Sequence, residues 1–180
     1  KIIKENLIDQ VYKKKSFFHK PFFSIDDNIV GESYKEKLLK IKKYLNKNNS
    51  DFIFITAPEN VAWLLNIRGV DNPNSPIPNC NLLIDKKSNP YLICEKKKAK
   101  KIILEKKIRK KQVIEFKNFE KLIKDLKGNK IIIDYKTCSL FFENILKKKF
   151  KILKKEDPIY LLKSIKSNKE IKNMISSHII

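Results

Sequence analysis

The chain alternates short apolar runs rich in β-forming residues with segments whose apolar residues recur at helical spacing. The main runs are DFIFIT at 51–56, NCNLLID at 79–85, PYLICE at 90–95 and NKIIIDY at 129–135, with shorter ones at QVIEF and KILKK. Buried strands read as short apolar runs, whereas covering helices show a period of 3.6 residues. KKSN, between the second and third runs, predicts a hairpin. We therefore expect an α/β domain with a mixed β-sheet flanked by helices.

Capping residues predict where several helices begin. Ser33, with Glu36 three residues later, forms a capping-box pattern before a segment with an apolar face. Asp157 followed by Pro158 is typical of an N-cap and a first helical residue. Further helices are expected from Pro58 onward, after Ser139, and over residues 97–108, 118–128 and 168–180.

The first thirty residues read as peripheral, because only Leu7 and Val11 show helical spacing before an irregular stretch. The compact domain is predicted to begin near Ser33. Tyr135 and Tyr160 flank predicted strands and helices, and we expect both in the core.

The chain is strongly basic, with 41 Lys and Arg against 20 Asp and Glu and a formal net charge of +21. Such a chain binds polyanions nonspecifically at low salt. Base readout and bidentate phosphate binding favour Arg, however, and Arg68 and Arg109 are the only arginines. Lys, Ile and Asn are enriched together, as AT-rich codon usage would produce. Codon usage is the favoured explanation, and functional basicity stays open.

No familiar catalytic or cofactor motif is present. Three glycines cannot form a Gly-rich phosphate loop, and no GxSxG or HExxH pattern occurs. Cys80, Cys94 and Cys138 form no CxxC pair, and His19 and His178 lie near opposite ends. We expect no metal site, buried cysteines and a reduced cytoplasmic interior. No run approaches the ~20 apolar residues of a membrane span.

The stretch AWLLNIRGVDNPNSPIP, residues 62–78, carries the clearest functional signal. Its prolines at 73, 76 and 78 can neither continue a helix nor sit inside a sheet, so a loop is expected. Arg68 and Asp71 lie at the start of this loop. Asp71 either forms a local ion pair with Arg68 or accepts backbone N–H bonds in a turn.

This stretch resembles the signature AWLLNIRG-x-D-x-P-x-x-P-V of the long, three-domain type of Xaa-Pro aminopeptidase. ENLIDQVYKKK resembles the LVD-x-IW segment that closes the first domain of that family, and VGESYKEKL resembles the AGES-x-x-EKL that opens its second. DPIYLLKSIKSNKEIKNMISSHI resembles the junction that leads into its catalytic domain. The ends depart from the family pattern: Tyr12 replaces Trp, Asn173 and Ile175 replace Gly and Arg, and Ser177 replaces Ala.

The resemblance implies a creatinase N-terminal-like domain with a defined place in a larger enzyme. Residues 1–30 would be the tail of a preceding domain and a linker, 31–163 the second domain, and 164–180 the start of the catalytic domain. The catalytic pita-bread domain, with its dinuclear manganese or zinc centre, would lie beyond the chain, so no catalytic or metal-binding residue is expected here. Implied partners are that domain, a second subunit in a cytoplasmic homodimer, and peptides with proline in second position.

The resemblance also suggests roles for residues of the loop. Arg68, Asp71 and Asn66 are expected to face the catalytic domain or the substrate entrance. A simpler interpretation is that Arg68 only ties the loop down.

Four further residues are assigned to the structural motif. Trp63 anchors the short helix in the core, Gly69 lets the backbone turn, and Pro73 and Pro76 stiffen the loop.

Two other functions stay open. Some relatives of this fold have lost catalysis, and a catalytically inactive binding module, such as a chaperone or a factor with acidic or nucleic-acid partners, would suit the charge of +21. A stand-alone nucleic-acid-binding protein is disfavoured, because the sequence lacks interleaved aromatic and basic residues and a basic recognition helix.

Overall fold

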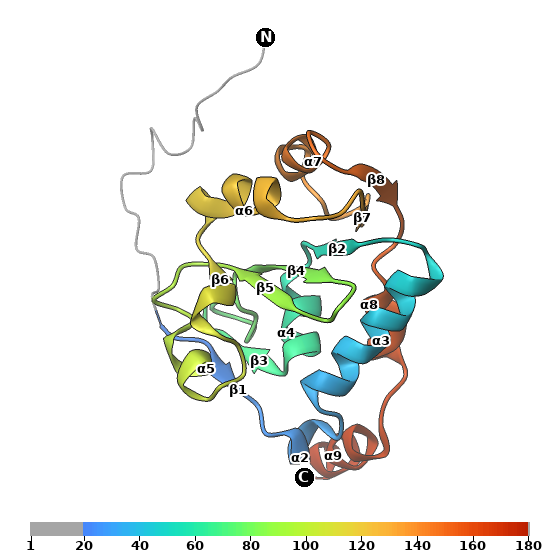
Figure 1. Ribbon diagram of the computed structural model, residues 1–180. Coiled ribbons are helices and arrows are strands. Elements are labelled where there is room, and N and C mark those ends of the chain that lie inside the picture. The colour runs from blue at the N-terminus through green and yellow to red at the C-terminus, as the bar shows by residue number, and fades with distance from the viewer. Residues whose placement is uncertain (1–19, 180) are drawn as a thin grey trace.

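Six strands form one mixed sheet at the centre of the computed structural model, which describes residues 20–179 (Figure 1). β2 runs antiparallel to β4 and parallel to β7, and β4 and β5 form the predicted hairpin. The predicted mixed sheet is therefore confirmed. In spatial order the strands are β6 (Val113–Ile114), β5 (Pro90–Ile93), β4 (Asn81–Asp85), β2 (Phe52–Ile55), β7 (Lys130–Ile133) and β8 (Lys151–Lys154).

Helices cover both faces of the sheet (Figure 1). One face carries α3 (Tyr34–Lys47), α4 (Pro58–Leu65) and α8 (Pro158–Ser164), and the other carries α6 (Phe119–Asp125) and α7 (Leu140–Leu146). The remaining helical segments are α2 (Asp27–Val30), α5 (Lys100–Leu104), α9 (Asn168–His178) and the 3-10 turns η1 (Lys110–Gln112) and η2 (Phe116–Asn118).

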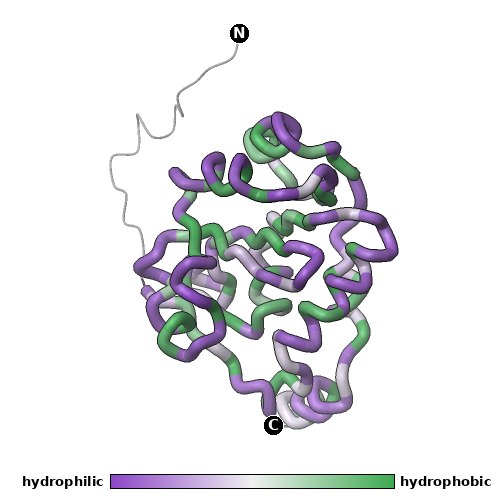
Figure 2. The backbone as a smooth tube through the Cα atoms, viewed as in Figure 1, coloured by the Kyte–Doolittle hydropathy of each residue, from purple (hydrophilic) through white to green (hydrophobic). Residues whose placement is uncertain are grey.

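The central strand β2 buries side chains on both faces. Ile53 and Ile55 belong to the cluster under α3 and α4, whereas Phe52 and Phe54 belong to the cluster under α6 and α7. A strand covered on both faces needs an unbroken apolar run, which explains the sequence FIFI. Figure 2 shows apolar residues gathered along the central strands and polar residues in many of the surrounding loops and helices.

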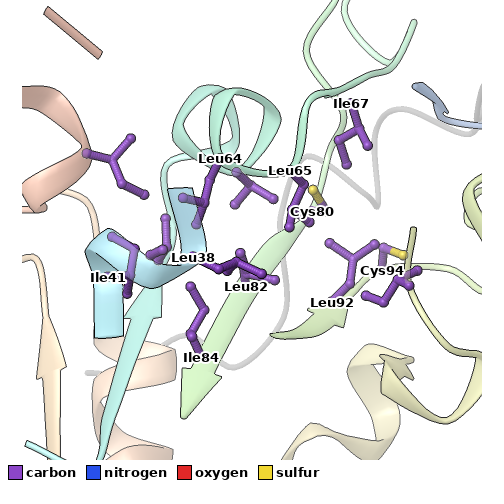
Figure 3. Close-up of a cluster of buried hydrophobic side chains, with 14 of the residues drawn as sticks. Leu38, Ile41, Leu64, Leu65, Ile67, Cys80, Leu82, Ile84, Leu92 and Cys94 are labelled. Atoms are coloured by element: carbon purple, nitrogen blue, oxygen red, sulfur yellow. The ribbon is translucent and has the colours of Figure 1, made fainter. Parts of the chain in front are cut away.

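The larger core cluster lies between α3, α4 and the sheet (Figure 3). Ile41 of α3, Leu64 of α4 and Leu82 of β4 are all fully buried there, and each such side chain stabilises the fold by about 1.5–3 kcal/mol. Cys80 and Cys94 lie in the same cluster, so their predicted burial is confirmed. Burial raises the pKa of both thiols, that of Cys94 to about 12.

Helix starts set by side-chain caps were predicted correctly. Ser33 and Glu36 make both hydrogen bonds of the capping box, and Asp157 accepts from the Ile159 N–H at 2.9 Å. Such caps contribute about 1 kcal/mol each. They act within one turn of chain, which is why sequence alone reveals them.

Three expectations about elements and burial are wrong. The helix expected over 97–108 spans only Lys100–Leu104, because Lys106 adopts a left-handed backbone with φ of 56°. The strand expected over QVIEF shrinks to the two residues of β6, since 3-10 turns flank it on both sides. Tyr135 is 57% exposed, because it lies in the turn between β7 and α7 rather than in the core.

Part of the segment expected to be peripheral packs onto the domain. Residues 1–19 lie outside the described residues, but Phe22 is fully buried and β1 (Phe23–Ser24) pairs antiparallel with β3 (Ile67–Arg68). The expected divisions after residues 30 and 163 stay predictions. Between residues 20 and 179 no helix has both the length and the apolar character to cross a bilayer.

Candidate functional site

The loop that carries the signature begins at Asn66, where α4 ends. Asn66 adopts the left-handed conformation, with φ 52° and ψ 45°, and its N–H bonds to the carbonyls of Ala62 and Trp63. Among residues other than glycine, Asn tolerates this conformation best, because its short polar side chain bonds locally. Asn66 therefore turns the chain from α4 into β3.

The side chain of Asn66 is buried and bonded at both ends of its amide. It is 1% exposed. Its Oδ1 accepts from Lys37 Nζ at 2.7 Å, and its Nδ2 donates to the Asp27 carboxylate at 3.0 Å and to the Glu32 carbonyl at 2.8 Å. Three segments, α2, the turn before α3 and α3 itself, thus meet at the first residue of the loop.

Lys37 is a buried cation beside this residue. Its Nζ lies 4.0 Å from the centroid of the Trp63 ring and donates to the Trp63 carbonyl at 2.9 Å. Burial lowers the pKa of Lys37 to about 8, although the charges of Glu32 and Glu170 act to raise it. A desolvated cation over Trp is stabilised by about 2 kcal/mol. Trp63, which packs against the edge of the core, therefore also forms one wall of a cation site.

Arg68 in β3 is half-buried and binds neighbouring backbone. Its Nη1 donates to the Ile67 carbonyl at 2.9 Å and to the Ala62 carbonyl at 3.4 Å, and burial lowers its pKa. These bonds fit the interpretation in which Arg68 ties the loop down. Within residues 20–179, its other N–H groups have no acceptor.

Asp71 pairs with Lys98 rather than with Arg68. Lys98 Nζ lies 2.7 Å from Asp71 Oδ1, with the two side chains only 7% and 9% exposed. The second carboxylate oxygen accepts from the Asn79 N–H at 2.6 Å. The sequence left open whether Asp71 pairs with Arg68 or accepts a bond from a backbone N–H, and the second is observed. The Lys98 carbonyl accepts from the Phe22 N–H at 2.8 Å, so the pair also fixes the loop to the chain before β1.

Gly69 is required for a close approach between the two ends of the loop. A Cβ at Gly69 would lie 2.6 Å from the Cα of Pro78, and the Gly69 N–H donates to the Pro76 carbonyl at 3.2 Å. Pro73 and Pro76 are exposed at the tip. A shallow pocket of about 280 Å³ beside the tip is lined by Pro58, Asp71, Asn72, Pro73, Ile77 and Asn79.

A second buried polar network joins α4 to α8, and no pattern in the sequence indicated it. Asn60 is fully buried; its Nδ2 donates to Asp157 at 2.7 Å and its Oδ1 accepts from Lys163 Nζ at 2.6 Å. The pKa of Asp157 is raised overall by burial, although the hydrogen bonds from Ile159 and Asn60 act to lower it. These partners lie about a hundred residues apart, so no local signal marks them.

The three candidate residues differ in what they offer a ligand. Asn66 and Asp71 are bonded to protein groups, whereas Arg68 has further donors that find no acceptor among residues 20–179. Residues 20–179 contain no cluster of three or more His, Cys, Asp or Glu suited to a metal ion. The fold and the site thus define an α/β domain with helices on both faces of its sheet and a proline loop held in place by buried polar contacts.

Comparison with known proteins places this domain in a family. Residues 13–170 match the family model for the creatinase/prolidase N-terminal domain, and the chain belongs to that family. The predicted creatinase N-terminal-like fold is confirmed.

Named relatives include peptidases that are much longer than this chain. The Xaa-Pro aminopeptidase 1 of Dictyostelium discoideum is 28% identical over 188 residues, which cover 97% of this chain and 29% of that protein. The X-prolyl aminopeptidase of Caenorhabditis elegans, described as a cytosolic enzyme with a di-nuclear active site, matches with a TM-score of 0.82 at 19% identity, over 98% of this chain and 30% of its own. The prolidase of Pyrococcus horikoshii matches with a TM-score of 0.52 at 28% identity, over 76% of this chain and 37% of its own. This chain therefore spans about three tenths of the length of the two aminopeptidases.

Proposed function

We propose that this chain is the noncatalytic second domain of a longer, metal-dependent Xaa-Pro aminopeptidase, which removes the N-terminal residue from peptides with proline in second position. The observation that carries the proposal is the match over 97% of this chain to a relative of that name, of which it covers 29%. Hydrolysis and a dinuclear manganese or zinc centre are assigned to a catalytic domain outside residues 1–180. The whole protein is proposed to be a cytoplasmic homodimer.

The exposed face of α9, which lies in the segment assigned to the start of the catalytic domain, supports contact with the rest of that domain. Ile171, Met174 and Ile175 are 44–58% exposed, and Ile179 just beyond the helix is 76% exposed. An amphipathic helix is stable when its apolar side is buried against another element. We assign this face to the catalytic domain.

Polar contacts connect α9 to the proline loop. Asn173 Nδ2 donates to the Ile29 carbonyl of α2 at 2.8 Å. In the same short helix, Asp27 accepts from Asn66 Nδ2 at 3.0 Å. A catalytic domain that begins with α9 is therefore held close to the loop, which suits a role of the loop in shaping substrate access.

Arg68 provides the test of that role, because its further donors can meet a carboxylate or carbonyl of the catalytic domain or of the peptide. In the gene extended to its natural stop codon, Arg68→Ala is expected to lower kcat/KM for a Xaa-Pro peptide about tenfold, the loss of one hydrogen bond to a charged donor. The free energy of unfolding should fall by less than about 1 kcal/mol. Arg109→Ala is the matched control, since Arg109 is the other arginine and is exposed.

Both arginine variants should be compared by kinetics and by urea unfolding. If Arg68→Ala weakens stability but leaves kcat/KM equal to that of Arg109→Ala, the residue only ties the loop down and its assigned role in access is wrong.

A further inference from the structure

A groove with an apolar floor and a rim of lysines lies beside α5. Figure 1 places α5 on the flank of the molecule opposite α3 and α8. The groove has a volume of about 380 Å³ and is lined by Lys96, Lys97, Lys100, Ile103, Leu104 and Lys110.

The floor is apolar because of how α5 ends. Ile103 packs partly against the core, and Leu104, the last residue of the helix, is 81% exposed. The left-handed Lys106 ends the helix there, and Lys107 turns inward to donate to the Asn66 carbonyl at 3.1 Å. Leu104 thus stays at the surface, and the aliphatic stems of the lysines extend the apolar area around it.

The rim is a cluster of positive charge. Residues 96–111 contain ten Lys and Arg and a single acid, Glu105. Lys98 forms an ion pair with Asp71, and the Glu105 carboxylate accepts a hydrogen bond from the Ser24 hydroxyl. The four lysines of the rim are all exposed, and none forms an ion pair in the part of the chain that the structure describes.

The charge and the shape of the groove indicate which kind of molecule it binds. A second copy would bring another net charge of +21, and residues 1–19 carry five lysines against two acids, so neither complements the rim. A nucleic-acid backbone has no need of an apolar floor. The groove of about 380 Å³ has room for a bulky side chain that projects from a partner protein, which the flat surface of a bilayer does not supply.

We propose that this groove, the α5 groove, binds an acidic segment of a partner protein. One bulky apolar side chain of the segment packs on Ile103 and Leu104. Aspartate or glutamate residues on either side of it pair with Lys100 and Lys110 and their neighbours. The lysines speed association and favour acidic partners, and the floor distinguishes a segment with an apolar residue from a plain polyanion.

The test is fluorescence anisotropy with a labelled peptide in which one Leu stands between blocks of Asp and Glu, and with the same peptide carrying Ser in place of Leu. At physiological ionic strength the Leu peptide should bind about tenfold more tightly, as expected for burying one such side chain. Leu104→Ser should remove that difference. Lys100→Glu combined with Lys110→Glu should abolish binding of both peptides.

Lys42→Glu combined with Lys43→Glu is the matched charge control, because both residues are exposed on α3, away from the groove. This pair should leave the preference for the Leu peptide unchanged. Equal binding of the two peptides, or equal loss with the control pair, would reduce the interaction to nonspecific polyanion binding and overturn the proposal. Leu104-dependent binding to phosphatidylserine vesicles without peptide binding would overturn it in favour of a membrane surface.

Discussion

Replacing Asn66 by glycine separates the two contributions of this residue, its left-handed backbone and its side-chain hydrogen bonds. Glycine keeps the left-handed turn at the end of α4 but removes the side chain that bonds Lys37, Asp27 and the Glu32 carbonyl. The backbone change alone should stabilise the protein by about 1 kcal/mol, because a left-handed L-residue is strained. The side-chain loss acts in the opposite direction.

The lost side-chain bonds outweigh the relief of strain. The bonds to the two charged groups, Lys37 and the Asp27 carboxylate, contribute about 1.5–3 kcal/mol each, and the bond to the Glu32 carbonyl contributes about 1 kcal/mol. After subtraction of the backbone gain, Asn66→Gly should lower the free energy of unfolding by about 3–6 kcal/mol. A cycle with Lys37→Met should show a coupling of about 1.5–3 kcal/mol, because the two side chains bond directly at 2.7 Å.

Urea unfolding followed by circular dichroism measures both quantities. Asn49→Gly is the matched control, since Asn49 is also left-handed, with φ of 47°, but is exposed. The control should be neutral or stabilising by up to about 1 kcal/mol. If Asn66→Gly behaves like Asn49→Gly, the buried network contributes nothing and our account of the signature asparagine is refuted.

Three further perturbations test other parts of the structure. Gly69→Ala should cost about 1–3 kcal/mol in urea unfolding, because its Cβ would lie 2.6 Å from the Cα of Pro78; an unchanged midpoint would disprove the close approach. Lys98→Met should cost about 3–5 kcal/mol, because it leaves Asp71 buried and uncompensated, whereas a cost below about 1 kcal/mol would mean that the carboxylate is solvated. The pKa of Lys37 is about 8 folded against 10.5 as its ordinary value, so the unfolded chain binds more protons between these values and stability should rise with pH there. Relative to Lys37→Met, the rise should be about 1–2 kcal/mol after allowance for solvent screening, and a flat difference would contradict the burial of a charged lysine.

Local signals account for what the sequence predicted well. Ser33 with Glu36, and Asp157 with Pro158, act within a single turn, and the apolar run of β2 is dictated by burial on both faces. From these features the strands, most helix starts and the mixed sheet could be predicted without any knowledge of distant contacts.

Distant partners account for what it missed. Asp71 bonds Lys98 27 residues away, and Asn66 bonds Lys37 29 residues away. Composition offers dozens of lysines, so no pattern selects these two. The left-handed turn at Asn66 and the close approach of Gly69 to Pro78 likewise depend on contacts that the local sequence does not reveal.

The central claim, that this chain supports a catalytic domain without performing the chemistry itself, is tested most directly by manganese-dependent hydrolysis of a short Xaa-Pro peptide. The 180-residue chain is compared with the same gene extended to its natural stop codon. We predict cleavage after the first residue by the extended protein, its loss on chelation of the metal, and no cleavage by the 180-residue chain. A well-folded extended protein that is inactive, or activity in the 180-residue chain alone, would contradict the account.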